Sequence, residues 1–247
     1  NSPYHGNTHH ADYTFIAPVF CGDELMFFAV TKGHQADIGN TIPSTYVPSA
    51  KDMFLEGAID WPCVKFQKDY KDVPDMIKVA MMRNRVPDLW YGDYLACLGS
   101  CRVGEKRLEA LCEEYGNDVI KDFCDAYQKY GAKRMEEELK LLPEGHYTYD
   151  IKADAIEGVV PEINIHIICE TKPKEGIIEF DLTENEDSMP CGLNMCEATV
   201  LASTVTGVLN RMPNDIPCND GAMSRIKVKM REGCVIGKAK APYSSSM

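Results

Sequence analysis

The stretch that decides the fold is residues 9–34, HHADYTFIAPVFCGDELMFFAVTKGH. It contains two apolar runs, residues 13–20 and 24–31, which are rich in aromatic and β-branched types and lie on either side of Gly22. Two such runs around a glycine-containing turn predict a β-hairpin. Pro18 cannot donate to a strand ladder, so we expect the first strand to lie at a sheet edge or to carry a bulge there.

Three candidate metal ligands flank this predicted hairpin. His9 and Asp12 precede the first strand and His34 follows the second. Because antiparallel strands lie about 5 Å apart, all three side chains are expected to converge at the open end of the hairpin. Two imidazoles and one carboxylate suit Mn²⁺, Fe²⁺ or Zn²⁺ and leave positions open for substrate. From the residues alone, an ordinary pair of loop histidines is an equally good interpretation.

His10 and Asp37 are candidates to assist this site as catalytic residues. Asp37 follows His34 closely and could accept the second N–H of a ligating histidine, or serve as a base. His10 is adjacent to His9 and is expected to point elsewhere if the backbone there is extended.

The rest of the chain changes from helical to strand-like patterning. Apolar spacing predicts helices over residues 73–85, 88–115 and 119–142. Gly116 separates the last two, which predicts an αα-hairpin. Strand-like runs and one small-residue helix follow, over residues 146–149, 163–169, 177–182 and 196–209. The sequence therefore predicts a mixed α/β (α+β) fold, with the hairpin and helices in residues 1–145 and a β-rich region in residues 146–247.

Composition narrows the class of protein. The net charge of −12 argues against binding to nucleic acid or to an anionic membrane. No apolar run approaches the roughly 20 residues that span a bilayer. The 11 cysteines are irregularly spaced and form no C-x-x-C pair. This favours a reduced, cytoplasmic protein with buried thiols over a disulfide scaffold.

Structural roles are favoured for several other residues with chemical potential. Free cysteines are often simply buried, and arginines are often surface charges. On these grounds packing or surface roles are expected for Cys97, Cys101, Cys191, Cys196, Arg83 and Arg85. A thiolate metal site at the cysteines, or a phosphate or carboxylate site at the arginines, is the less favoured interpretation.

An ordered series of motifs runs through almost the whole chain. It includes Gly6-Asn-Thr-His-His-Ala-Asp12, Gly33-His-Gln-Ala-Asp-Ile-Gly39, Arg83-Asn-Arg-Val-Pro87, Gly92-Asp-Tyr-Leu95 and Asn219-Asp-Gly221. This series resembles the hydantoinase B/oxoprolinase family, whose members include subunits of N-methylhydantoinase, 5-oxoprolinase, and the acetone and acetophenone carboxylases. The family's subunits are much longer, so the resemblance implies an internal portion of a larger subunit. Ser2 departs from the family, which usually has Asp there.

The resemblance also implies a site and a partner. Carried over by position, the metal ligands are His9, Asp12 and His34, and ATP is bound by a hydantoinase A-type partner subunit. The chain itself contains no G-x-x-x-x-G-K-[ST] phosphate loop, in agreement with ATP binding elsewhere.

The branch of the family decides the reaction on a small-molecule carbonyl substrate. Residues 33–37 and 87–94 look more like the carboxylases, so the leading prediction is the metal-containing subunit of an ATP-dependent ketone carboxylase of acetone/acetophenone type. ATP-dependent hydrolysis of a cyclic amide, such as hydantoin or 5-oxoproline, is the alternative. A non-catalytic assembly subunit is a third interpretation.

Overall fold

The N-terminal hairpin forms as the alternating pattern predicts. In the computed structural model, which describes residues 1–245, β1 (Asp12–Cys21) pairs antiparallel with β2 (Glu24–His34), after the short 3-10 helix η1 (Pro3–His5). Within those residues no third strand joins this sheet, so Pro18 lies on an edge strand, as expected. Val19 and Ala29 on the inner face are buried against α3 (Pro87–Tyr115).

A β-bulge in β2 sets the register at the open end of the hairpin. Met26 pairs with no residue of β1, and beyond it the pairing is shifted by one residue. Asp12 consequently lies opposite His34 rather than opposite Gly33. Because side chains alternate between the two faces of a strand, His34 would otherwise face away from Asp12.

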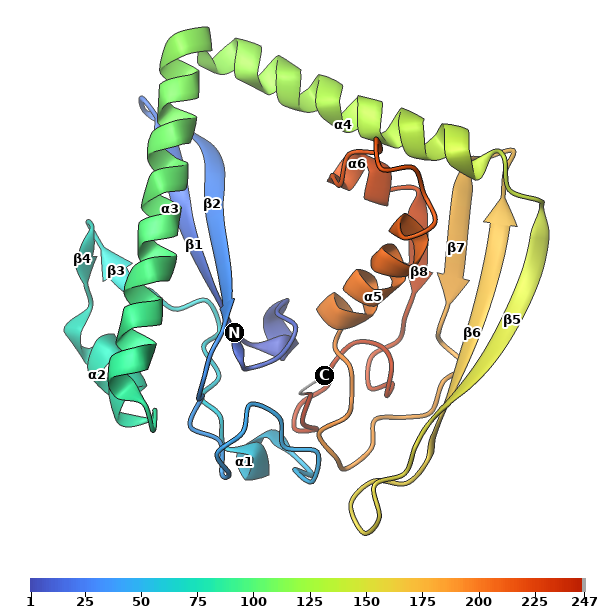
Figure 1. Ribbon diagram of the computed structural model, residues 1–247, viewed down its shortest axis with the longest axis horizontal. Coiled ribbons are helices and arrows are strands. Elements are labelled where there is room, and N and C mark those ends of the chain that lie inside the picture. The colour runs from blue at the N-terminus through green and yellow to red at the C-terminus, as the bar shows by residue number, and fades with distance from the viewer. Residues whose placement is uncertain (246–247) are drawn as a thin grey trace.

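The two long helices diverge and do not form the expected αα-hairpin. α3 lies along the hairpin, whereas α4 (Asn117–Leu139) runs across to the C-terminal sheet (Figure 1). Gly116 joins them with φ 85° and ψ 146°, a conformation that suits glycine and turns the chain away. Beyond its first turn, where Ile120 still packs with the hairpin, α4 therefore buries its apolar residues on a different partner from α3. Cys112 of α3 packs with the hairpin, and Leu139 of α4 packs with β7 (Ile177–Asp181).

The C-terminal part is a four-stranded sheet covered by helices. Its strand order is β5-β6-β7-β8, formed by Gly145–Ala153, Ile163–Lys172, Ile177–Asp181 and Ile226–Lys229. The sequence predicts strands in the first three positions, and these pair as antiparallel neighbours, whereas the short β8, which is parallel to β7, was missed. α5 (Glu197–Leu209) contributes Val208 to the core beside Ile178.

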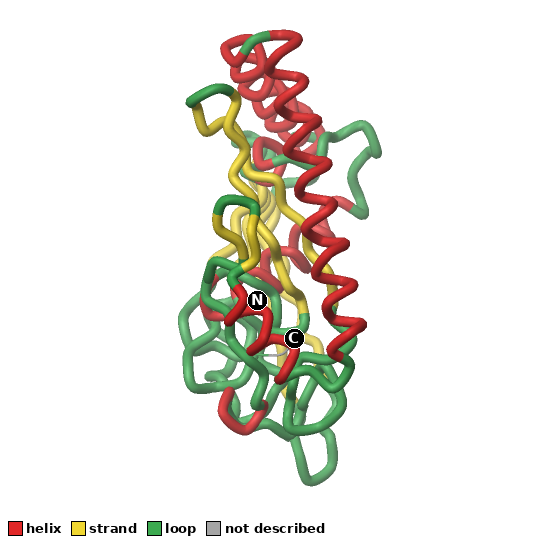
Figure 2. Tube along the Cα trace, turned by 90° about the vertical axis from the view of Figure 1, so that its left-hand side faces the viewer, coloured by secondary structure: helices red, strands yellow, loops and turns green. Residues whose placement is uncertain are grey.

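Shorter elements connect these parts. They are α1 (Met53–Glu56), β3 (Gln67–Lys68), β4 (Lys71–Asp72), α2 (Pro74–Met82) and α6 (Asp220–Met223). Loops gather at one end of the molecule (Figure 2), where the N-terminal segment meets the last described residues through a hydrogen bond from Tyr4 Oη to the Tyr243 carbonyl oxygen, 2.7 Å. Within residues 1–245, no helix has the length and apolar character needed to cross a membrane. The division after residue 145 falls at the start of β5 and stays a prediction.

Candidate metal centre

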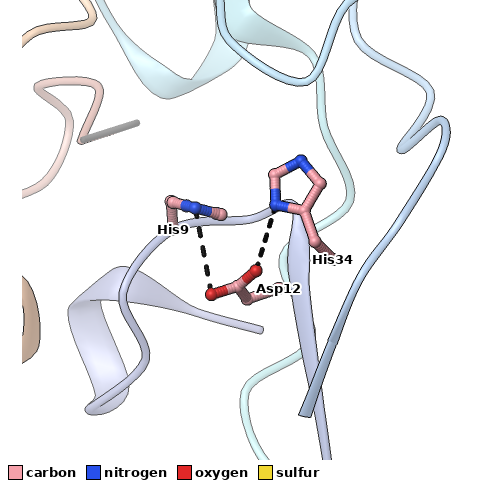
Figure 3. Close-up of side chains that lie close together, drawn as sticks. All are labelled: His9, Asp12 and His34. Atoms are coloured by element: carbon pink, nitrogen blue, oxygen red, sulfur yellow. Dashed lines mark hydrogen bonds and ion pairs between the residues drawn. The ribbon is translucent and has the colours of Figure 1, made fainter.

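His9, Asp12 and His34 converge at the open end of the hairpin (Figure 3). One potential ligand atom from each residue lies within 4.8 Å of the other two. Asp12 is central, with Oδ1 3.1 Å from His34 Nδ1 and Oδ2 3.9 Å from His9 Nε2. The rings of His9 and His34 meet edge to face, with centroids 5.2 Å apart. Strand pairing brings Asp12 and His34 together, and the loop before β1 adds His9.

Neighbouring side chains hold this group in place. Thr8 Oγ1 donates to Asp12 Oδ2 at 2.7 Å, and Lys32 Nζ lies 3.7 Å from the same oxygen. Tyr46 Oη is 3.2 Å from His9 Nε2, and Thr45 Oγ1 is 3.2 Å from His34 Nε2. Tyr46 and Thr45 lie in the long loop after β2, which has no periodicity, so the sequence carried no signal for their role.

The electrostatic environment favours the protonation states that a cation requires. Burial lowers the pKa of His9, which keeps its imidazole neutral. Burial alone would raise the pKa of Asp12, but the hydrogen bonds from Thr8 and His34 and the charge of Lys32 outweigh it, and the pKa is lowered. Metal ligands must be neutral imidazoles and ionised carboxylates. The donor set therefore fits a divalent cation.

A cavity of about 440 Å³ opens beside the group. It is lined by Thr8, His9, Asp12, Tyr46, Thr199, Ala202 and Ser203, so α5 from the β-rich part forms one of its walls. The start of α5 is held against the loop between η1 and β1 (residues 6–11, here called the metal loop because it carries His9). The contact is made by the Cys196 thiol, which lies 3.0 Å from both the Asn7 and the Thr8 carbonyl oxygens. Cys196 is fully buried, in agreement with the structural role expected for it.

The two predicted catalytic residues lie outside this group. Asp37 is buried and accepts hydrogen bonds from the Arg85 backbone N–H at 2.9 Å, the Arg85 guanidinium at 2.7 Å and the Gly39 N–H at 3.2 Å. Burial opposes ionisation, but these donors outweigh it and lower the pKa of Asp37. A carboxylate held this way accepts from Arg85 rather than from a ligating histidine, and it is a poor base. The expected roles of Asp37 at the site are therefore not supported by its contacts.

His10 turns away from the group formed by His9, Asp12 and His34 (the metal group), as expected for the neighbour of His9. Its Nδ1 lies 3.2 Å from Glu56 Oε1, and both side chains are buried. Ser2, where the family usually has Asp, is also buried and donates to Asp60 at 3.0 Å instead of contacting the metal group. Arg83 donates to backbone carbonyls of Gly39 and Gly57, a structural contact.

Comparison with known proteins identifies the family. The sequence profile named hydantoinase B/oxoprolinase matches residues 1–247. The chain belongs to the hydantoinase B/oxoprolinase family.

Relatives within this family differ in the reaction that their names describe. This hydantoinase B/oxoprolinase chain is 36% identical over 246 residues to a putative B-type subunit of a D-/L-hydantoinase from a Pseudomonas species, with 94% of the chain and 41% of the relative covered. It is 27% identical over 243 residues to the β-subunit of the caprolactamase of Pseudomonas jessenii, covering 98% of the chain and 41% of that protein. The chain thus spans about two fifths of the length of these relatives.

Two solved structures share the fold. The ATP-dependent caprolactamase of Pseudomonas jessenii superposes with a TM-score of 0.91 at 24% identity, covering 100% of this chain and 42% of that one. Nucleotide-free acetone carboxylase superposes with a TM-score of 0.90 at 18% identity, covering 100% and 34%. The mixed α/β fold predicted from the sequence is confirmed by these superpositions.

Proposed function

We propose that the larger protein containing this chain opens a cyclic amide in an ATP-dependent reaction, at a divalent metal held by His9, Asp12 and His34. The observation that carries the proposal is the convergence of these three side chains beside a cavity. Support for the reaction comes from the sequence relatives, because the hydantoinase and the caprolactamase both act, by name, on cyclic amides.

Ketone carboxylation, which the motifs favoured, now ranks second. The features that look carboxylase-like include Gln35, Trp90 and Tyr94, and these three residues are 3%, 2% and 1% exposed. Gln35 donates to the Gly33 carbonyl oxygen, while Trp90 and Tyr94 stack within the core. None of the three lines the cavity beside the metal group. They therefore bear on packing of the fold more than on the choice of substrate.

The residues of this chain have distinct tasks in the proposed reaction. Thr8 and Lys32 orient the Asp12 carboxylate, and Tyr46 lies beside His9 at the mouth of the site. A bound divalent cation would supply Lewis acidity toward the substrate carbonyl. ATP held by a hydantoinase A-type partner would transfer its γ-phosphoryl group to the amide oxygen and leave as ADP. Water would then attack the ring carbon, and the C–N bond would break with the nitrogen leaving as an amine, which gives an acyl phosphate. A second water would hydrolyse this acyl phosphate to the ring-opened acid and inorganic phosphate. The cavity beside α5 has room for a small ring.

An assay of the full-length protein with its ATP-binding partner tests the proposal. We expect ATP hydrolysis to be stimulated by hydantoin, 5-oxoproline or caprolactam without bicarbonate, and the ring-opened acid to accumulate. His34→Ala should abolish this activity and release the metal, measured by elemental analysis. The matched control is His166→Ala, because His166 is also paired with an aspartate, Asp150, at 2.7 Å.

The same assay separates the alternatives. Stimulation by acetone only when bicarbonate is present would establish carboxylation and refute amide hydrolysis. A protein without stoichiometric metal, whose complex tolerates His34→Ala, would instead be a non-catalytic assembly component.

A further inference from the structure

A buried polar chain lies directly behind the metal loop and links three distant parts of the sequence. His10 Nδ1 donates to Glu56 Oε1 at 3.2 Å, and Ser244 Oγ donates to Glu56 Oε2 at 2.6 Å. The exposed fractions of His10, Glu56 and Ser244 are 1%, 0% and 0%. Glu56 ends α1, so one short helix connects the metal loop to the C-terminal region.

This arrangement is specific because each carboxylate oxygen has its own partner. A carboxylate removed from water is tolerated only when hydrogen bonds replace its hydration. The second ring nitrogen of His10, Nε2, is buried and has no hydrogen-bond partner among residues 1–245. Glu56 is therefore the hydrogen-bonding group that orients the His10 imidazole.

The orientation of His10 bears on the metal group because His9 precedes it. The two residues share one peptide unit, and their side chains lie on opposite sides of the loop, with His9 against Tyr46 and His10 against Glu56. Asn1 reinforces the anchor by donating from Nδ2 to the His10 carbonyl oxygen at 2.8 Å. With His10 held in this way, His9 has little freedom to leave Asp12.

We propose that Glu56 is a positioning residue for the metal centre, which holds the His9 loop in its ligating conformation through His10, with Ser244 completing the anchor. The proposal rests on the proposed function only in so far as His9, Asp12 and His34 bind a divalent cation. It assigns no contact with substrate to Glu56.

The test measures metal affinity in the full-length protein, by chelator competition with Mn²⁺ and with Zn²⁺. The variants are Glu56→Ala, which removes both acceptors, and Glu56→Gln, which can still accept from His10 and meet the Ser244 hydroxyl. Ser244→Ala removes one partner of Glu56. Val208→Ala in the distant core serves as a control for destabilisation, and the melting temperature of every variant is recorded.

We expect Glu56→Ala to weaken metal affinity about 10-fold or more, as is typical when groups that orient metal ligands are removed. Glu56→Gln should restore most of the affinity, Ser244→Ala should lose less than Glu56→Ala, and Val208→Ala should melt earlier with unchanged affinity. Wild-type affinity in a folded Glu56→Ala protein would overturn the positioning role alone. If Glu56→Ala does not fold, unchanged affinity in Ser244→Ala overturns it. A wild-type protein that binds no metal would overturn both this role and the proposed function.

Discussion

Replacing Asp12 with Asn separates metal binding from folding. In the metal-free protein the change weakens two contacts of the carboxylate, with Lys32 and with His34, whose side chains are 40% and 46% exposed, so solvent screening limits the loss to about 1 kcal/mol or less. The amide can still accept the hydrogen bond from Thr8. We therefore expect the melting temperature of the metal-free variant to stay within about 4 °C of the wild type, since 1 kcal/mol shifts a chain of this size by roughly 2–4 °C.

The response to metal is where the two proteins should differ. At a metal concentration 100 times its Kd, binding stabilises the wild type by about 2.7 kcal/mol, which corresponds to a shift of roughly 5–11 °C. Asp12→Asn loses the central donor of the group, so its shift should fall below about 1 °C on this scale. Differential scanning fluorimetry with Mn²⁺ and Zn²⁺ measures both values. Asp150→Asn, at the other aspartate–histidine pair, should respond like the wild type. An equal shift in Asp12→Asn would refute the ligand assignment.

Three further outcomes follow from the structure. Deleting Met26 should remove the bulge but leave Asp12 opposite His34, because Met26 has no partner in β1, so elemental analysis should find the metal retained; loss of metal would show that the bulge itself shapes the site. Asp37→Asn should destabilise the protein at neutral pH. Because folding lowers the pKa of Asp37, the difference in the free energy of unfolding between this variant and the wild type should shrink below about pH 4. Urea unfolding at several pH values measures it, and a pH-independent difference would contradict the role of the Arg85 pair. Cys196→Ala should cost about 1–3 kcal/mol in the same assay, since a buried thiol would no longer meet two carbonyl groups, and a neutral effect would argue against that contact.

Local patterning was sufficient for most of the secondary structure. The alternating runs around Gly22 define β1 and β2, and helical spacing defines α3 and α4 within a few residues. The strand β8 was missed because its four residues, Ile226–Lys229, are too short for a pattern, and its pairing with β7 is parallel and distant in sequence. The divergence of α3 and α4 was missed because a helix boundary at Gly116 is compatible with many interhelical angles.

The site was predictable to the extent that strand pairing is local. Asp12 and His34 are joined by one hairpin, so sequence spacing could bring them together. Asp37 lies close to His34 in the chain, yet its partner is Arg85, 48 residues away. Tyr46 and α5 reach the site through an irregular loop and through contacts between the two halves of the chain.

The sequence by itself therefore determined most of the longer elements, the hairpin, the three candidate ligands and the family resemblance, because these depend on residue type and short-range spacing. The tertiary structure decided which faces meet. It assigned Asp37 to Arg85, His10 to Glu56, and α5 to the wall of the metal cavity. The physical reason is that a buried polar or charged side chain needs a partner that replaces its hydrogen bonds to water. That partner can lie far away in the sequence, so only the folded chain determines which group it is.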